Sequence, residues 1–208
     1  MKTLIVLCHP SNENFSRVIQ SETSILYDKY KLEFEIRNLY QIGFNPIISS
    51  NDIAAYKMGT AQEDVLREQE YIRSADLIIF IYPIWWTGMP AMMKGYIDRV
   101  FSEGFAYSIT TKGRKKLLKK KKVVIVSTAE QNSKPHHVSS SYEQIINAEK
   151  QIFESCGMDV ILHHHVEDYM SLENQPQILK QKIDELKPEI KKLFLLKLNC
   201  QLNIPTMF

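Results

Sequence analysis

Two adjacent tryptophans stand in the segment IYPIWWTGMPAMMKGYIDRVF, residues 81–101. Aromatic rings beside the backbone that Gly88 exposes are suited to binding a flat heteroaromatic ligand. The alternative is that Trp85 and Trp86 cap the hydrophobic core, as large aromatic side chains often do. This loop is expected at the ligand-binding edge of the fold described below, and that position favours the ring-binding role.

A second candidate segment, CHPSNENFS at residues 8–16, could hold a phosphate. His9, Asn14 and Ser16 are side-chain donors, and the start of the helix that follows adds backbone amides and a positive dipole end. The segment contains no glycine, so the dinucleotide fingerprint G-x-G-x-x-G is absent. Alternatively, Ser16 only caps the helix and His9 packs beneath the loop, and the segment alone does not choose between these interpretations.

The third segment, STAEQNSKPHHVSSSY at residues 127–142, carries His136 and Tyr142. Such groups can donate hydrogen bonds to a ring on which negative charge develops, although surface histidines are more often solvated. The run His163–His165 lacks a carboxylate-rich pattern, so no metal site is expected. The basic run Lys115–Lys122 is interpreted as a solvated turn, with recruitment of a phosphorylated cosubstrate as the alternative.

The elements that position these segments follow from hydrophobic periodicity. Short apolar or alternating runs predict five strands, at residues 4–7, 32–36, 77–82, 123–126 and 160–166. Helical spacing predicts helices at residues 15–30, 62–73, 90–101, 142–155 and 177–195, with Ser16 available as a cap and an irregular stretch at 40–50. Alternation of this kind indicates an α/β fold, a five-stranded parallel sheet of order 2-1-3-4-5 with helices on both faces.

In that strand order, ligands bind at the carboxyl ends of the strands where the winding reverses, beside strands one and three. The three segments above follow strands one, three and four, so they should meet at this edge. The fold therefore gathers the tryptophans, the phosphate donors and the histidine loop into one predicted site.

The bulk composition narrows the class of protein. The chain has 208 residues, 44% of them hydrophobic, and a formal net charge of +2, which gives no reason to expect a nucleic acid partner. We expect one domain over residues 1–195, followed by a tail, 196–208, of unknown role. Three cysteines without metal-ligand spacing, and no apolar stretch long enough to span a bilayer, favour a soluble protein of a reducing compartment, the cytoplasm.

The sequence resembles the NAD(P)H dehydrogenase (quinone) family, which has a flavodoxin-like three-layer sandwich fold. That family includes DT-diaphorase, the bacterial modulators of drug activity and flavoprotein partners of potassium-efflux systems. The resemblance covers about residues 3–195. It is carried by LIVLCHP with NFS, NLYQIGFNPIIS at 38–49, SADLIIFIYPIWWTGMPAMMKGYIDRVFSEGFAY at 74–107, and SCGMDVI at 155–161.

The resemblance implies a homodimer that binds FAD or FMN non-covalently and passes hydride from NADPH or NADH to a quinone, nitro or azo acceptor. In the family's ping-pong scheme, nicotinamide and acceptor use one pocket in turn. The residues that would line this site are the phosphate-side group His9, Asn14, Phe15 and Ser16, the ring-side group Pro83, Ile84, Trp85 and Trp86, and the acceptor-side pair Trp86 and Thr87.

The turn at Thr128, Ala129, Glu130 and Gln131 aligns with the family's T-T-G-G turn, which binds the pyrimidine end of the flavin. The chain lacks both glycines there, so a left-handed backbone would be costly, and a carboxylate at Glu130 could repel a reduced, anionic ring. The family's catalytic Tyr and His fall near His136 and Tyr142, with the identities exchanged. Two other roles remain open: a flavin-bearing regulatory subunit of a potassium-efflux membrane protein, and a flavodoxin-like electron carrier.

Overall fold

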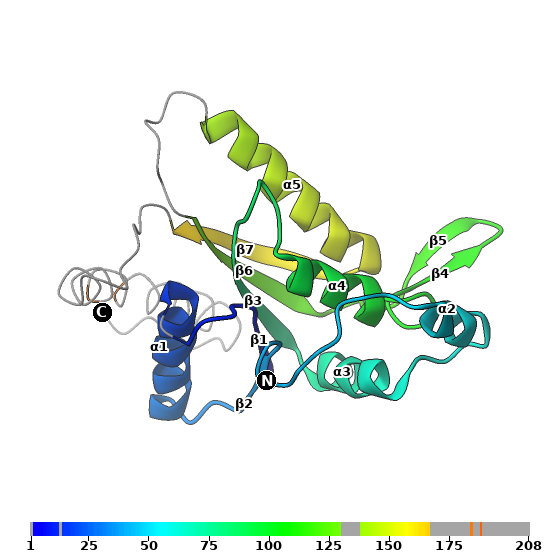
Figure 1. The fold of residues 1–208 in the computed structure, drawn as a ribbon, viewed down its shortest axis with the longest axis horizontal. Helices are drawn as coiled ribbons and strands as arrows, with labels where there is room; N and C mark the ends of the chain where they lie inside the picture. The colour runs from blue at the N-terminus through cyan, green and yellow to red at the C-terminus, as the bar shows by residue number, and fades with distance from the viewer. Residues whose placement is uncertain (1, 13, 130–137, 167–183, 185–187, 189–208) are drawn as a thin grey trace.

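The computed structural model describes residues 2–12, 14–129 and 138–166, together with Asp184 and Pro188; for 138–142 it describes the backbone only. Five parallel strands form the central sheet in the order β2-β1-β3-β6-β7. Their bounds are β1 Thr3–Leu7, β2 Phe34–Asn38, β3 Leu77–Pro83, β6 Lys122–Thr128 and β7 Asp159–Val166. In chain order the sheet is 2-1-3-4-5, which confirms the predicted fold class (Figure 1).

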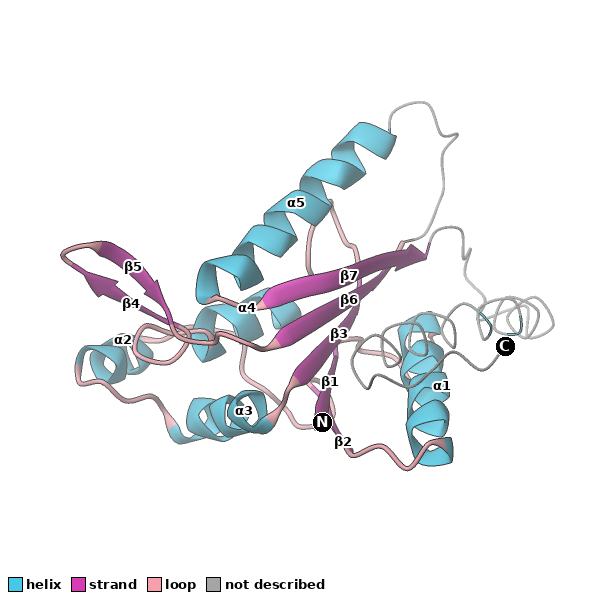
Figure 2. Cartoon of the chain, turned by 180° about the vertical axis from the view of Figure 1, so that it is seen from behind, coloured by secondary structure: helices cyan, strands magenta, loops and turns pink. Residues whose placement is uncertain are grey.

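Helices cover both faces of the sheet. The helices of the described segments are α1 Phe15–Lys29, α2 Ser50–Lys57, α3 Glu63–Ser74, α4 Ala91–Val100 and α5 Val138–Cys156. Side chains of α1 pack with Ile5, Ile79 and Val124 on one face, and side chains of α3, α4 and α5 join the core on the opposite face. Figure 2 shows α1 on one side of the sheet and α3, α4 and α5 on the other. Because β1 and β3 are covered on both sides, all of their residues are buried, and this explains their unbroken apolar runs.

Several boundaries differ from the sequence prediction. Helix α2 was not expected; it begins with a capping box in which Ser49 and Asp52 bond each other's backbone amides. Pro90 is the N-cap of α4 instead of lying in its first turn. Part of the predicted lysine turn is strand: β4 Tyr107–Thr110 and β5 Gly113–Lys116 form an exposed antiparallel hairpin. Of the predicted helix at 177–195, the structure describes Asp184 and Pro188, both helical, and the tail 196–208 lies outside the described residues.

A buried arginine fastens α2 and α3 to α4. The Arg99 side chain is 5% exposed, and its Nη2 donates to Asp52 Oδ1 at 2.8 Å. Its Nη1 contacts Asp64 Oδ2 at 2.5 Å and donates to the carbonyl of Asn45 at 2.8 Å. Burial alone would raise the pKa of Asp52, but hydrogen bonds from Arg99 and Ser49 outweigh it and hold that pKa below its ordinary value.

Gly95 lets the chain before α2 cross close over α4. A Cβ at this position would lie 2.1 Å from the carbonyl oxygen of Pro46, so a larger residue would force the two segments apart. Gly95 and Arg99 both belong to the KGYIDRVF text, and Asn45 and Pro46 belong to NPIIS. Much of the sequence that carries the family resemblance therefore fastens α4 to the segments around it.

Replacing Arg99 with methionine should lower the free energy of unfolding by about 3–5 kcal/mol, because the carboxylate of Asp52 would stay buried without its cation. Urea unfolding at pH 7 measures this loss. The control is Lys94→Met, which removes an exposed pair with Asp98 and should cost less than about 1 kcal/mol. Equal losses in the two variants would contradict the assignment of Arg99 as the central fastening residue.

Candidate functional site

The loops that follow β1, β3 and β6 meet at the carboxyl edge of the sheet, where the winding reverses between β1 and β3. The amide of Ile84 donates to the carbonyl of Thr128 at 2.7 Å, which joins the second loop to the third. The hydroxyl oxygens of Ser16 and Thr128 lie 3.4 Å apart, which joins the start of α1 to the same residue. The predicted convergence of the three segments is therefore present in the structure.

The second loop forms a tight turn with unusual backbone geometry. Trp85 and Gly88 exchange two backbone hydrogen bonds, of 3.0 and 3.2 Å, around the central residues Trp86 and Thr87. Those residues have φ of 49° and 63°, in the left-handed region that favours glycine and asparagine. A β-branched threonine there is strained, at a cost of about 1–3 kcal/mol. The strain sits on Trp86 and Thr87, since Gly88 has no positive φ.

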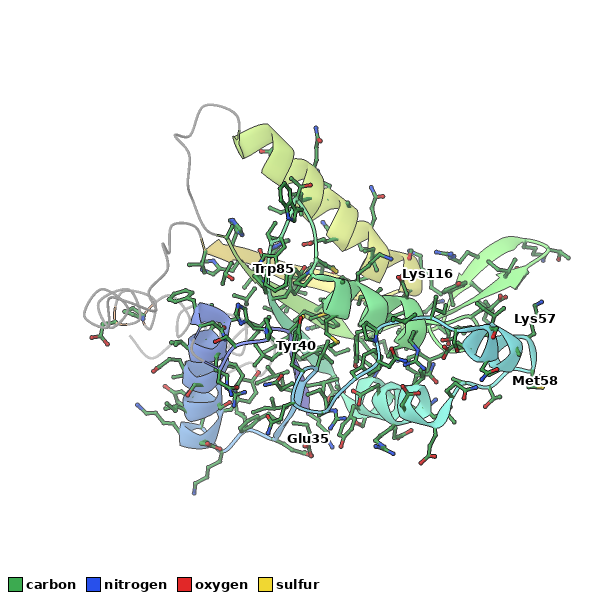
Figure 3. The ribbon with its side chains drawn as sticks, in the orientation of Figure 1. Glu35, Tyr40, Lys57, Met58, Trp85 and Lys116 are labelled. Atoms are coloured by element: carbon green, nitrogen blue, oxygen red, sulfur yellow. The ribbon has the colours of Figure 1, made fainter. Side chains whose placement is uncertain are left out.

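The two tryptophans differ in their surroundings. Trp86 is 100% exposed, so its ring covers no part of the core, and the core-capping alternative is excluded for it. Trp85 is 42% exposed and meets the ring of His9 edge-on, with centroids 6.0 Å apart. Trp85 lies toward one end of the central sheet, and Lys116 of the hairpin lies toward the other end (Figure 3). The loop thus presents an exposed aromatic surface at the switch point.

The first loop is held by its own side chains. Asn14 is the N-cap of α1 and accepts from the amide of Arg17 at 2.9 Å, so the alternative interpretation, in which Ser16 caps this helix, is wrong. Ser16 is fully buried, and the Phe15 side chain is 1% exposed within the core. Nδ1 of His9 accepts from the amide of Ser11 at 3.2 Å. Of the four predicted phosphate-side residues, His9 is the one that combines partial exposure with a ring beside Trp85.

The third loop is described only as far as its first residues. Thr128 ends β6 fully buried, and the amide of Ala129 donates to the carbonyl of Val166 at 3.1 Å. The predicted residues Glu130, Gln131 and His136 lie outside the described segments, and Tyr142 is placed by its backbone in the first turns of α5. Pro83, the remaining predicted residue, is the buried last residue of β3.

A cluster of buried polar groups beside this edge was not predicted. Ser127 Oγ lies 3.0 Å from His163 Nε2 and 2.9 Å from His165 Nδ1, and Glu149 of α5 approaches His163 Nε2 to 3.7 Å. Burial, with a smaller contribution from neighbouring histidines, lowers the pKa values of both histidines to about 4. Burial raises the pKa of Glu149 to about 7, against the effect of a hydrogen bond from Tyr82.

Other chemistries lack support among the described residues. No group of three or more His, Cys, Asp or Glu side chains there could hold a metal ion, and no helix there is long and apolar enough to cross a membrane. Cys8 lies next to the site, but burial raises its pKa to about 12, so it stays a protonated thiol and a poor nucleophile.

The observed donors and surfaces fit a flavin. A flat ring needs an aromatic or apolar wall, which Trp86 and Trp85 offer, and a phosphate needs positive potential, which the N-terminus of α1 offers beside His9. These features define a doubly wound α/β protein whose switch point carries an exposed aromatic surface beside a helix N-terminus.

The chain belongs to the flavodoxin-like fold family (Flavodoxin_2), which matches residues 1–190. It is 40% identical over 108 residues to an uncharacterized NAD(P)H oxidoreductase of Haemophilus influenzae, covering 51% of this chain and 54% of that protein. It is 35% identical over 127 residues to NAD(P)H dehydrogenase [quinone] 1 of Rattus norvegicus, covering 53% and 46%. The chain spans about half the length of the curated relatives it matches. The family resemblance seen in the sequence is confirmed.

Solved structures agree on the fold. Smu.1420 from Streptococcus mutans has a TM-score of 0.74 at 27% identity, over 92% of this chain and 100% of that one. An FMN-dependent NADH-azoreductase from Bacillus anthracis, solved in complex with FMN, has a TM-score of 0.69 at 17% identity, over 93% and 99%. At the latter identity the likeness concerns the fold alone.

The double variant Trp86→Asn/Thr87→Gly should raise the free energy of unfolding by about 1–3 kcal/mol. Asn-Gly is the pair that adopts positive φ at both central positions most readily, and no burial is lost because Trp86 is exposed. Chemical denaturation compares it with Met58→Asn, which changes an exposed residue with φ of −87° and should have almost no effect. A less stable double variant would show that the turn is not strained.

Proposed function

We propose that the protein is a flavin-dependent NAD(P)H oxidoreductase that reduces quinone-like acceptors by two electrons. The observation that carries this proposal is the fully exposed Trp86, held in a strained turn at the strand reversal beside the N-terminus of α1. Strain that persists at an exposed apolar side chain is of the kind that ligand-binding sites retain. The curated relatives named as NAD(P)H oxidoreductase and NAD(P)H dehydrogenase [quinone] support the reaction type.

Three loops of the chain would share the binding of the cofactor, FAD or FMN, each contacting a different part of it. Trp85, Trp86, Ile84 and Pro83 would line the flat ring, and His9 with the N-terminus of α1 would face its phosphate. Asn14 would keep that helix end in place through its cap, and Ser16 would do so through Thr128. A bound flavin would supply the hydride chemistry, accepting hydride from NADPH or NADH and passing it to the acceptor.

The remaining predicted residues would act at the open side of the ring. Trp86 and Thr87 would wall the pocket that nicotinamide and acceptor occupy in turn, as a ping-pong scheme requires. Thr128, Ala129, Glu130 and Gln131 would approach the pyrimidine end, and His136 and Tyr142 would assist hydride transfer. Quinones, nitro compounds and azo compounds are the acceptors this arrangement would serve, and the relative named NAD(P)H dehydrogenase [quinone] 1 supports the first of these.

We also propose that the working unit is a cytoplasmic homodimer. Three apolar side chains on and before α2 are at least 44% exposed, namely Ile47, Ile48 and Ile53. A contact between two copies would remove this surface from water. Lys57, the last residue of α2, lies at the end of the molecule away from Trp85 (Figure 3).

Trp86→Ala should weaken flavin binding about tenfold or more while leaving the free energy of unfolding nearly unchanged, because the ring contacts ligand and not core. Fluorescence quenching of FMN and of FAD during titration gives the two affinities. Met58→Ala, which removes another exposed apolar side chain, is the control and should bind flavin like the parent protein. Equal affinities in all three proteins would show that Trp86 does not contact the flavin.

The reaction is tested by anaerobic addition of NADPH or NADH to the flavin-loaded protein. Bleaching of the visible spectrum, recovery of colour with a soluble quinone, and parallel double-reciprocal plots are the expected results. A protein that binds neither flavin contradicts the proposal. Bleaching without turnover, together with co-purification of a membrane antiporter, would favour the regulatory subunit instead.

A further inference from the structure

The buried polar cluster beneath α5 lowers the stability of the fold unless its groups bond one another, and hydride transfer itself does not account for it. Glu149 and His163 have side chains 5% and 6% exposed, and Tyr82 and Ser127 are fully buried. Placing this many polar groups in a core costs free energy unless they bond one another. The cluster lies at the carboxyl end of the sheet: Tyr82 pairs with Ser127, one residue before Pro83 and Thr128.

A bulge in β7 places two of its histidines in this cluster. Val123 pairs with Val160 but Val124 pairs with Leu162, so Ile161 is an extra residue on β7. Because strand side chains alternate, one extra residue reverses the faces of all that follow. His163 and His165 thereby face α5 beside Ile125 and Ser127, whereas a regular strand would turn them to the α1 face.

We propose that Glu149 and the two histidines that Ser127 bridges, His163 and His165, form a buried proton store that exchanges one proton with the ligand-binding edge of the sheet when negative charge develops there. Glu149 holds the proton, and the histidines and the Ser127 hydroxyl carry it. The carrying path runs from His163 Nε2 through Ser127 Oγ to His165 Nδ1, over 3.0 and 2.9 Å. Ser127 is covalently bonded to Thr128, whose carbonyl holds the amide of Ile84 in the ring-binding loop.

Among the described residues, the titratable groups near Glu149 are Tyr82 from β3 and His163 from β7, and Ser127 links His163 to His165. Because both histidines are neutral above about pH 5, no described cation neutralises the carboxylate, and its pKa of about 7 leaves it divided between two protonation states at neutral pH. A negative charge appearing nearby would favour its protonated form. Glu149 is therefore poised to gain a proton on reduction and lose it on reoxidation.

The proposed reaction, on which this inference rests, consumes one proton, and the cluster is a group that could store it. Hydride transfer from NAD(P)H to a bound flavin would bring two electrons and one proton and so add one negative charge, which the cluster would offset by taking one proton from solvent. The quinone then receives that hydride and the stored proton. The sum is quinone, NAD(P)H and one proton giving hydroquinone and NAD(P)⁺.

Proton storage by Glu149 is tested first by unfolding the protein in urea between pH 4.5 and 8. A folded-state pKa raised to about 7 gives stability that is present at low pH and lost as pH rises through 7. The stability of Glu149→Gln relative to the parent protein should therefore rise from pH 4.5 to 7, by roughly a hundredfold in the unfolding equilibrium constant, and this difference should stay constant above pH 7. Glu154→Gln, an exposed change on the same helix, is the control and should show no such trend. A pH-independent difference between Glu149→Gln and parent would overturn the proposal.

Coupling to the site is tested by reducing the FMN-loaded protein with NADPH at pH 7.5 in a weakly buffered indicator solution. The parent protein should take up more protons per flavin than Glu149→Gln, by up to one. Ser127→Ala should take up as many protons as the parent protein but more slowly. Loss of packing alone would not slow the uptake while leaving its total unchanged. Equal uptake by parent and Glu149→Gln, with flavin bound and reduced, overturns the proton store and leaves the proposed reaction standing. A protein that binds no flavin overturns both.

Discussion

The parallel arrangement of β1, β3 and β6 governs the rest of the molecule. Parallel strands of one sheet end at the same edge, and the chain changes direction of winding between β1 and β3, so three loops distant in sequence are brought together there. Thr128 joins the three loops at this edge, because its carbonyl accepts from the amide of Ile84 and its hydroxyl contacts that of Ser16. The position of the tryptophan turn and of the α1 N-terminus follows from that edge.

Rigidity around the edge comes from interactions at some distance from it. Arg99, buried between Asp52 and Asp64, joins three helices, and Gly95 allows the chain at Pro46 to cross α4 closely. A firmly packed α4 in turn fixes the end of the loop that carries Trp86. The strained conformation of that loop can persist because the surrounding structure determines it.

The polar cluster beneath α5 shows how a small irregularity changes chemistry. One extra residue in β7 places His163 and His165 against Ser127 and near Glu149, in a region otherwise filled by apolar side chains such as Phe153. Burial then raises the pKa of the Glu149 carboxyl to about 7 and lowers that of the His163 imidazole to about 4, so the usual order of the two groups is reversed. Groups of this kind are typical of functional sites.

The sequence by itself determined the strand order, the layers and the convergence of the three loops, because unbroken apolar runs such as 77–82 and helical periodicity reflect burial directly. Only the tertiary structure decided that Asn14 caps α1, that Trp86 is wholly exposed, and that His163 faces Glu149 while His165 contacts Ser127. Capping, turn conformation and a bulge each depend on a shift of one or two residues, which periodicity does not resolve. Contacts such as those of Arg99 join residues 35 or more apart, and spacing along the chain carries no record of them.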